Sequence, residues 1–309
     1  MFSDRLSTDI RILDKVNGYL SERTGKQLRP IFTLLTARAL RGFCNENVIR
    51  CAAAVEMLHT ATLLHDDVAD DSSIRRGSPT IRALYSPTTS VLVGDFWLSR
   101  AIETIVGYCD QRVILSFSSS LEMLAEGEMI QLEKAEKLDT TEEDYFKIIY
   151  CKTASLFETA ILSPAYCVNA NDGEIEAMRE YARHIGTAFQ IMDDIMDYSP
   201  QLNIGKPSGQ DILEKKVTLP LFGYLRNTSQ KEAGKLLARI RRIGENPDDD
   251  KGFCREAVDL VNRYGGVEYA RKRLETEISA GIESIDILSE SKAKSYLVEL
   301  AGHMAVRTR

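Results

Sequence analysis

Apolar residues recur at helical spacing along nearly the whole chain of 309 residues. They return every three or four positions, which is the period of one face of an α-helix. Runs that alternate apolar and polar residues between turn pairs are scarce. The segments that carry a helical stripe are 5–20, 28–42, 46–70, 90–107, 112–137, 142–162, 173–198, 229–243, 253–264, 266–285 and 290–305. We therefore expect an all-α fold.

The breaks between these segments do not divide the chain into separate domains. Prolines fall mostly at the breaks, because proline cannot continue a helix. Pro30 lies near a helix start, and Pro79 and Pro87 lie in a predicted loop. The sequence contains no low-complexity linker and no short repeat. We expect a single domain over residues 1–309.

Two acidic motifs of the form DDxxD lie in long predicted helices. The first acidic motif runs from Asp66 to Asp70 and the second from Asp193 to Asp197. Residues i and i+4 lie on one helix face about 6 Å apart, so each motif presents two carboxylates in one direction. Such carboxylates repel each other and are unfavourable among apolar neighbours unless cations neutralise them. Oxygen ligands suit Mg²⁺, which also binds substrate phosphates, so the motifs predict a magnesium–diphosphate site.

Basic residues near the first motif predict a second anion site. Lys26 and Arg29 lie on a turn that opens a predicted helix, where free N–H groups and the helix dipole favour anions. His59 lies two turns before Asp66 on the same helix face, and Arg76 follows the motif. Arginine presents a planar fork of donors that matches phosphate oxygens. These four residues have no obvious carboxylate among them, which separates this site from the magnesium site.

Composition narrows the choice of function. The net charge of −7 and the pI near 5.4 argue against a general nucleic-acid-binding protein. We find no uninterrupted apolar stretch of about 18 residues, so no spanning helix is expected. The N-terminal segment lacks an apolar signal core, and we expect a soluble, cytoplasmic protein. The six cysteines show no CxxC and no zinc-like spacing, which favours reduced, buried thiols.

Seven segments carry a resemblance to a known family. In chain order they are GKQLRP, EMLHTATLLHDDVADDSSIRRG, LVGDFWLSRA, GEMIQL, KTASLFE, GTAFQIMDDIMDY and KVTLPL. In order and spacing they resemble the all-trans polyprenyl diphosphate synthases over nearly the whole chain. The resemblance implies a helical bundle around a deep cavity, a homodimer and three Mg²⁺ ions per active site. It implies a reaction that lengthens an allylic diphosphate, such as farnesyl diphosphate, by condensation with isopentenyl diphosphate.

The resemblance also implies roles for individual residues. The predicted magnesium ligands are Asp66, Asp67, Asp70, Asp193 and Asp197, with Asp67 and Asp197 in supporting positions. The predicted contacts of the allylic diphosphate and its carbocation are Arg75, Lys152, Thr153, Gln190, Lys206 and Lys216. The predicted isopentenyl diphosphate site consists of Lys26, Arg29, His59 and Arg76. Catalysis is expected to depend most on Asp66, Asp70, Asp193, Arg75, Lys152 and Lys216. Asp71 and Asp194 are expected to be solvated or to cap a helix.

The residues before the first motif predict the length of the product. Thr62 and Ala61 lie four and five positions before Asp66, about 6–7.5 Å along the helix. Short-chain members of the family commonly carry an aromatic plug there, and an alanine cannot stop a prenyl tail. The first motif also lacks the two-residue insertion typical of bacterial farnesyl diphosphate synthases. We therefore expect a long-chain product between hexaprenyl and decaprenyl, with an octaprenyl chain for a quinone as the leading prediction.

Three alternatives remain open. A plug from another helix would make the enzyme a short-chain synthase of farnesyl or geranylgeranyl diphosphate. A terpene cyclase also ionises a prenyl diphosphate, but it binds a single substrate and needs no second anion site. A non-catalytic partner subunit would be expected to lose one acidic motif, whereas this chain keeps both.

Overall fold

The computed structural model describes residues 6–23, 25–75, 77–199 and 208–305. The chain divides into two compact units. The first unit comprises Met1–Ser119, Glu158–Arg179 and Ile287–Leu297, and the second comprises Ser120–Phe157, Glu180–Asp286 and Val298–Arg309. No helix among the described residues has both the length and the apolarity needed to cross a lipid bilayer.

The regular structure is helical in both units, which confirms the all-α prediction. The helices are α2 (Arg11–Glu22), α3 (Leu28–Arg41), α4 (Glu46–Ala69), α5 (Ile81–Leu84), α6 (Pro87–Val106), α7 (Gln111–Lys137), α8 (Glu142–Ile149), η1 (Tyr150–Ala154), α9 (Ser155–Cys167), α10 (Asp172–Asp197), α11 (Gln210–Leu213), α12 (Leu219–Asn227), α13 (Gln230–Arg241), α14 (Pro247–Arg263), α15 (Gly266–Ser284) and α16 (Lys292–Ala305). In the described part of the chain, the only strands are β1 (Ile74–Arg75) and β2 (Ser78–Pro79), which pair antiparallel.

Two local differences from the predicted helices affect the site. The segment predicted as one helix over 142–162 is interrupted by a π-helical turn, η1, between α8 and α9. The nine-residue helix α12 was not predicted. Leu219 through Tyr224 are all buried, so this helix has no polar face in its first two turns and shows no amphipathic stripe.

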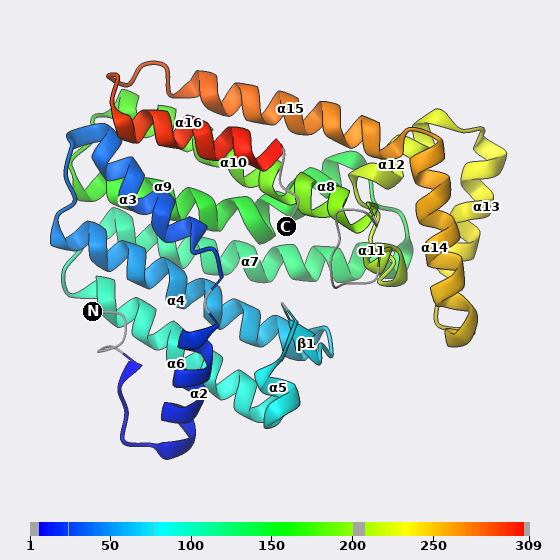
Figure 1. Cartoon of the computed structure of the whole chain (residues 1–309), viewed down its shortest axis with the longest axis horizontal. Helices are drawn as coiled ribbons and strands as arrows, with labels where there is room; N and C mark the ends of the chain where they lie inside the picture. The colour runs from blue at the N-terminus through cyan, green and yellow to red at the C-terminus, as the bar shows by residue number, and fades with distance from the viewer. Residues whose placement is uncertain (1–5, 24, 76, 200–207, 306–309) are drawn as a thin grey trace. The chain divides into compact units, whose positions relative to one another are not determined.

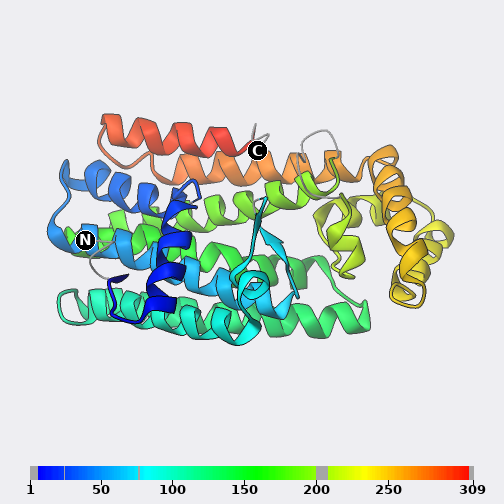
Figure 2. The ribbon, with the colours of Figure 1, turned by 60° about the horizontal axis from the view of Figure 1, so that its bottom comes forward.

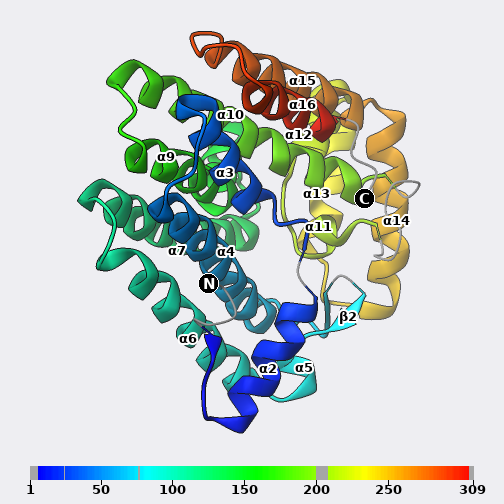
Figure 3. The same ribbon diagram turned by 60° about the vertical axis from the view of Figure 1, so that its left-hand side comes forward.

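The first unit is built around α4 and α6, which lie side by side (Figures 1 and 3). Trp97 of α6 is fully buried and its indole N–H donates to Oδ1 of Asn17 in α2 over 2.9 Å. The β1–β2 hairpin lies beside α5 (Figure 2). The hydroxyl of Thr80 donates to the carbonyl of Ser72 over 2.8 Å, which ties the two ends of the hairpin segment together. This bond positions the residues that follow the first acidic motif.

The second unit holds α12 against α14 and α15 (Figure 3). A polar contact between α10 and α15 lies in the same unit, where Nδ1 of His184 is 2.7 Å from Oε2 of Glu277. Arg273 also donates to Glu277, over 2.8 Å from its Nε. The hydrogen bond to Glu277 raises the pKa of His184, although partial burial opposes the rise.

We expect this contact to make the stability of the second unit depend on pH. A raised pKa in the folded state means that protonated His184 stabilises the fold. The contribution is fully present below the unfolded pKa of about 6.5 and is lost as pH rises through the higher folded value. The free energy of unfolding in urea should therefore fall from pH 6 to pH 8.5 more steeply in the native chain than in His184→Gln. Parallel pH profiles for the two proteins would show that the contact contributes no pH dependence.

Candidate active site

The first acidic motif lies at the carboxyl end of α4. The side chain of Asn45 caps the start of this helix by accepting from the amide of Val48 over 2.9 Å. Asp66 lies in the last turn and is half-buried, whereas Asp70 caps the helix end and is exposed. The carbonyl end of a helix carries a partial negative charge. Two carboxylates placed there increase the negative potential, which favours a bound cation.

Asp67 has a different environment from Asp66 and Asp70. It is buried, and its Oδ1 accepts a hydrogen bond from Nε of Arg75 over 2.7 Å. Asp67, a predicted supporting ligand of magnesium, is thus paired with Arg75, a predicted contact of the allylic diphosphate. The positive charge of Arg75 partly neutralises the carboxylate of Asp67. The β1–β2 hairpin fixes the position of Arg75 beside α4. Asp71, by contrast, is exposed and pairs with Arg82, as expected for a solvated residue.

A cavity of about 290 Å³ in the first unit brings several predicted residues together. His59, Asp67, Arg75 and Gly25 all line it. Lys26 follows Gly25 directly and is exposed, and Arg29 is buried in the first turn of α3. The predicted helix start at residue 28 is confirmed. Arg76 and Lys206 lie outside the described residues, so the predictions for these two residues stay untested.

The second acidic motif lies at the end of α10. Asp193 is half-buried. Asp197 accepts hydrogen bonds from the backbone amides of Gln210 and Asp211 over 3.1 and 3.0 Å, and so caps α11 with its side chain. Asp197 thereby anchors the segment that follows the motif, and its role in supporting the magnesium ligands stays a prediction. The expectation for Asp194 was wrong: it is only 4% exposed, so it is neither solvated nor at a helix start.

A chain of hydrogen bonds explains why Asp194 is buried. The hydroxyl of Tyr145 donates to Oδ2 of Asp194 over 2.7 Å, and Nε2 of Gln190 donates to Oδ1 over 2.9 Å. The hydroxyl of Thr153 in turn donates to Oε1 of Gln190 over 2.6 Å. Two residues predicted to flank the carbocation are therefore joined to the second motif. Tyr145 comes from α8, and no local pattern in the sequence indicates its contact with Asp194.

A second cavity, of about 200 Å³, lies in the second unit and is lined by Lys152, Gln190, Asp194, Asp211 and Lys216. Lys152 pairs with Glu128 and Lys216 pairs with Glu214. Two of the three lysines predicted to bind the allylic diphosphate, Lys152 and Lys216, thus line one cavity with Asp194 and Asp211. The neighbouring Lys215 also lines this cavity and donates to the carbonyl of Arg241 over 3.2 Å, so the role of Lys216 stays a prediction.

Two carboxyl groups of the second motif, those of Asp194 and Asp197, have raised pKa values. Burial raises the pKa of Asp194 to about 7, and this effect outweighs the lowering by its hydrogen bonds from Tyr145 and Gln190; the charges of Asp193 and Asp197 add a smaller rise. Burial also raises the pKa of Asp197 and raises that of Asp211 further, with the charges of Asp194 and Asp197 adding to the effect on Asp211. Asp211 was not predicted as a site residue. The buried Asp194 and the half-buried Asp197 and Asp211 thus form a concentration of carboxylates that favours a divalent cation.

Close helix contacts set the position of η1, which carries Lys152 and Thr153. A Cβ added to Gly127 in α7 would lie 2.7 Å from Cβ of Cys151. A Cβ added to Gly186 in α10 would lie 2.5 Å from Cα of Ala154. Both distances are too short for carbon atoms, so glycine is required at these two positions. Short π-helical turns of this kind occur frequently at functional sites.

Gly186→Ala should therefore destabilise the second unit. The new methyl group would collide with the backbone of η1, and overpacking of this kind costs about 3 kcal/mol. The matched control is Gly234→Ala, because Gly234 lies in the middle of α13 with no atom near its missing Cβ. That control should be stabilised by about 0.5–1 kcal/mol, since alanine favours helices over glycine. Urea unfolding of the three proteins measures both effects, and equal changes in the two variants would contradict the close contact.

The residues of both motifs fit magnesium on chemical grounds. Asp66 and Asp70 add negative charge to a helix carboxyl end, and Asp193 adjoins a group of acids with raised pKa values. Hard oxygen donors of this type prefer Mg²⁺ or Ca²⁺ to softer metals. Charged partners for phosphate accompany each motif: Arg75 in the first unit, and Lys152 and Lys216 in the second.

Comparison with known proteins agrees with this chemistry. The sequence profile of the family described as Polyprenyl synthetase matches residues 10–258. The chain belongs to the polyprenyl synthetase family. It is 36% identical to the octaprenyl diphosphate synthase of Haemophilus influenzae, over 96% of this chain and 89% of that protein. It is 33% identical to the short chain isoprenyl diphosphate synthase of Methanothermobacter thermautotrophicus, over 95% of this chain and 90% of that protein.

A solved structure of the family resembles the fold closely. The polyprenyl synthase of Caulobacter crescentus CB15, solved with calcium and isoprenyl diphosphate, superposes with a TM-score of 0.91. The match covers 100% of this chain and 93% of that chain at 32% identity. These findings confirm the resemblance, the isoprenoid synthase fold and the assignment of the chain as a trans-prenyltransferase.

Proposed function

We propose that this prenyltransferase condenses isopentenyl diphosphate with an allylic diphosphate, in the presence of Mg²⁺, to make a long-chain all-trans polyprenyl diphosphate. The observation that carries the proposal is that each unit has an acidic motif and basic partners suited to phosphate. Membership of the family supports the reaction type. The similarity to an octaprenyl diphosphate synthase supports a long product and a role in supplying a quinone side chain.

The two acidic motifs would bind magnesium ions, three per active site, around the diphosphate of one allylic substrate. Asp66, Asp70 and Asp193 are the proposed direct ligands. Asp67 and Asp197 would support them, through the contact with Arg75 and through the cap of α11. Bound magnesium supplies positive charge that stabilises the diphosphate as the allylic C–O bond breaks.

Basic side chains of the chain would hold the same diphosphate. Lys152 and Lys216 line a cavity beside Asp194, where their carboxylate partners Glu128 and Glu214 keep them in place until substrate binds. Arg75 and Lys206 are the proposed further contacts. The oxygen atoms of Thr153 and Gln190 would flank the carbocation, and their mutual hydrogen bond fixes the direction in which each oxygen points.

The second substrate would bind separately. Lys26, Arg29, His59 and Arg76 are the proposed contacts for the diphosphate of isopentenyl diphosphate. The π electrons of its double bond would form a new C–C bond to the carbocation, and a proton would then leave the adjacent carbon. The departing diphosphate is a base able to accept that proton, so no side chain is needed as the base.

Small side chains before the first motif support a long product. Ala61 is 1% exposed, and the hydroxyl of Thr62 donates to the carbonyl of His59 over 2.9 Å. The hydroxyl is therefore turned back onto its own helix. We propose that the growing chain passes these positions toward Ala54, Met57 and Leu58. We also propose that the enzyme is a cytoplasmic homodimer whose product partitions into membranes.

A single assay distinguishes a long-chain synthase from a short-chain synthase, a terpene cyclase and a non-catalytic subunit. Purified protein is given Mg²⁺, farnesyl diphosphate and radiolabelled isopentenyl diphosphate, and the products are resolved by chain length. A ladder ending between hexaprenyl and decaprenyl supports the proposal. Termination at geranylgeranyl diphosphate would establish a short-chain synthase, and a cyclic hydrocarbon would establish a terpene cyclase. Absence of turnover would indicate a non-catalytic subunit and contradict the proposal.

A further inference from the structure

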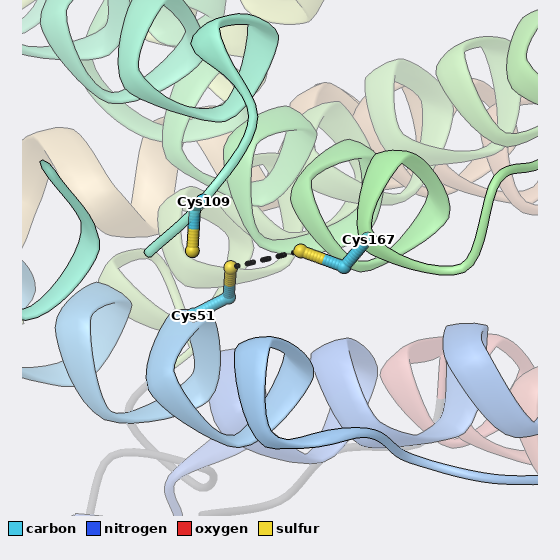
Figure 4. A group of neighbouring side chains, drawn as sticks. All are labelled: Cys51, Cys109 and Cys167. Atoms are coloured by element: carbon cyan, nitrogen blue, oxygen red, sulfur yellow. Dashed lines mark hydrogen bonds between the residues drawn. The ribbon is translucent and has the colours of Figure 1, made fainter. Parts of the chain in front are cut away.

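Three cysteines that are far apart in the sequence lie together in the first unit. Cys51 belongs to α4, Cys109 follows α6, and Cys167 is the last residue of α9. Their sulfur atoms all lie within 4.8 Å of one another, and those of Cys51 and Cys167 are 3.7 Å apart. Figure 4 shows the three side chains directed toward one another. A disulfide bond is about 2 Å long, so these are three separate thiols, and we refer to them as the thiol cluster.

Hydrogen bonds fix the segments that carry the thiol cluster. Asn45 caps α4 through its side-chain oxygen, and its Nδ2 donates to the carbonyl of Cys167 over 2.8 Å. One residue therefore joins the start of α4 to the end of α9. The amide of Cys109 donates to the carbonyl of Ile105 over 2.9 Å, which holds this segment to the end of α6. The convergence of the thiols is thus built into the packing of the unit.

A buried guanidinium lies beside the thiol cluster. Arg50 is 8% exposed, pairs with Glu46 and stacks over the ring of Tyr108 at 3.6 Å. Its Nε and Nη1 atoms have no hydrogen-bond partner among the described residues. Hydrogen bonds from the thiols of Cys167 and Cys51 lower the pKa of Cys109, and the charge of Arg50 lowers it further, whereas the pKa values of Cys51 and Cys167 are raised, first of all by their hydrogen bonds with Cys109. Thiolate is the form that binds metals, so a bound metal would displace the protons of Cys51 and Cys167.

We propose that Cys51, Cys109 and Cys167 bind one Zn²⁺ ion, with a fourth position open to water. Tetrahedral zinc binds thiolate sulfur at about 2.3 Å, which places two such sulfur atoms about 3.8 Å apart. The sulfur atoms of Cys51 and Cys167 already have nearly this separation. Cys51 is buried, whereas Cys109 and Cys167 are half-buried, so a water molecule can complete the coordination.

Charge favours Zn²⁺ over Cu⁺, the other common ion for thiolate sites. Three thiolates and Zn²⁺ carry a net charge of −1, and the guanidinium of Arg50, which also pairs with Glu46, lies beside them. Cu⁺ would leave an additional negative charge in a mostly buried place. Asp110, whose charge acts on Cys167, already pairs with Arg112 over 2.9 Å.

This site is distinct from the proposed magnesium site. Cys51 and Asp66 belong to the same helix, and their separation along it is about 22 Å at the rise of an α-helix. Zinc here would join α4, α9 and the segment after α6, and so would stabilise the first unit without entering the reaction. The proposal therefore does not depend on the proposed function.

Cobalt titration tests the site directly, because Co²⁺ substitutes for Zn²⁺ and bonds from thiolate to Co²⁺ produce an intense ultraviolet absorption. The reduced, full-length protein is titrated in excess Mg²⁺, so that carboxylate sites are filled. We expect the absorption to saturate at one equivalent of Co²⁺ and to disappear when one equivalent of Zn²⁺ is added. Cys51→Ser, Cys109→Ser and Cys167→Ser should each lose most of it. Cys254→Ser is the matched control, since Cys254 is a buried free thiol outside the cluster, and it should keep the full signal.

A second measurement avoids variants that fold poorly. In the native protein, Zn²⁺ should protect the three clustered cysteines from alkylation, as read by mass spectrometry, and should raise the melting temperature. Absence of thiolate absorption would overturn the proposal, as would absorption that persists in all three serine variants. Binding of Cu⁺ with no binding of Zn²⁺ would also overturn it.

Discussion

Asp66→Asn is expected to lower kcat about a thousandfold, which corresponds to about 4 kcal/mol of lost transition-state stabilisation. The amide has nearly the size of the carboxylate but carries no charge, so it would weaken the proposed magnesium site at the end of α4. Steady-state kinetics with farnesyl and isopentenyl diphosphates would measure the loss. We also expect the Mg²⁺ concentration needed for half-maximal rate to rise, which a merely structural role would not cause.

The matched control for this experiment lies five residues away. Asp71→Asn removes the same charge from an exposed residue whose backbone has φ of 52°, a conformation that asparagine tolerates well. Its partner, Arg82, is not proposed to bind substrate. We expect kcat within about twofold of the native value, because surface substitutions have small effects. Equal losses in the two variants would refute the assignment of Asp66 as a metal ligand.

Ala61→Tyr is expected to change the product from a long-chain to a short-chain polyprenyl diphosphate. The new ring would lie about 7.5 Å along α4 from Asp66 and would stop a chain that grows past this position. The proposed metal ligands are unchanged, so consumption of isopentenyl diphosphate should continue while the chains end early. Chromatography of the products against length standards measures the shift.

Ala52→Tyr controls for the effect of placing a large residue in a packed helix. Ala52 is also buried in α4, and the nine-residue offset places it on the opposite face from Ala61. We expect this variant to lose stability through overpacking but to keep the native product length. If Ala61→Tyr turns over and still gives the native product length, the floor of the cavity must be formed by other residues.

The sequence predicted those parts of the fold whose residues show a regular apolar period. The helix predicted over 173–198 is observed as α10, Asp172–Asp197, because one face of it is apolar along its length. The π-helical turn η1 was not predicted, since its register depends on contacts with Gly127 and Gly186 in other helices. Such contacts between distant segments leave no periodic signal in the sequence.

In the candidate site, too, local sequence patterns could be recognised, whereas contacts between distant segments could not be predicted. The acidic motifs could be recognised from local patterns in the sequence. The burial of Asp194 could not be predicted, because it depends on a hydrogen bond from Tyr145 in a different helix. The pairing of Asp67 with Arg75 required the geometry of the β1–β2 hairpin. The thiol cluster was missed for the same reason, since its members come from three separate segments.

A crystal structure of the protein with Mg²⁺ and an unreactive thio-analogue of farnesyl diphosphate tests the central claim most directly. The claim is that both acidic motifs act on one diphosphate. We expect a single analogue whose diphosphate oxygens share magnesium ions with Asp66 and Asp70 and also with Asp193. Ions bound at only one motif, or a separate diphosphate at each motif, would contradict the proposed mechanism.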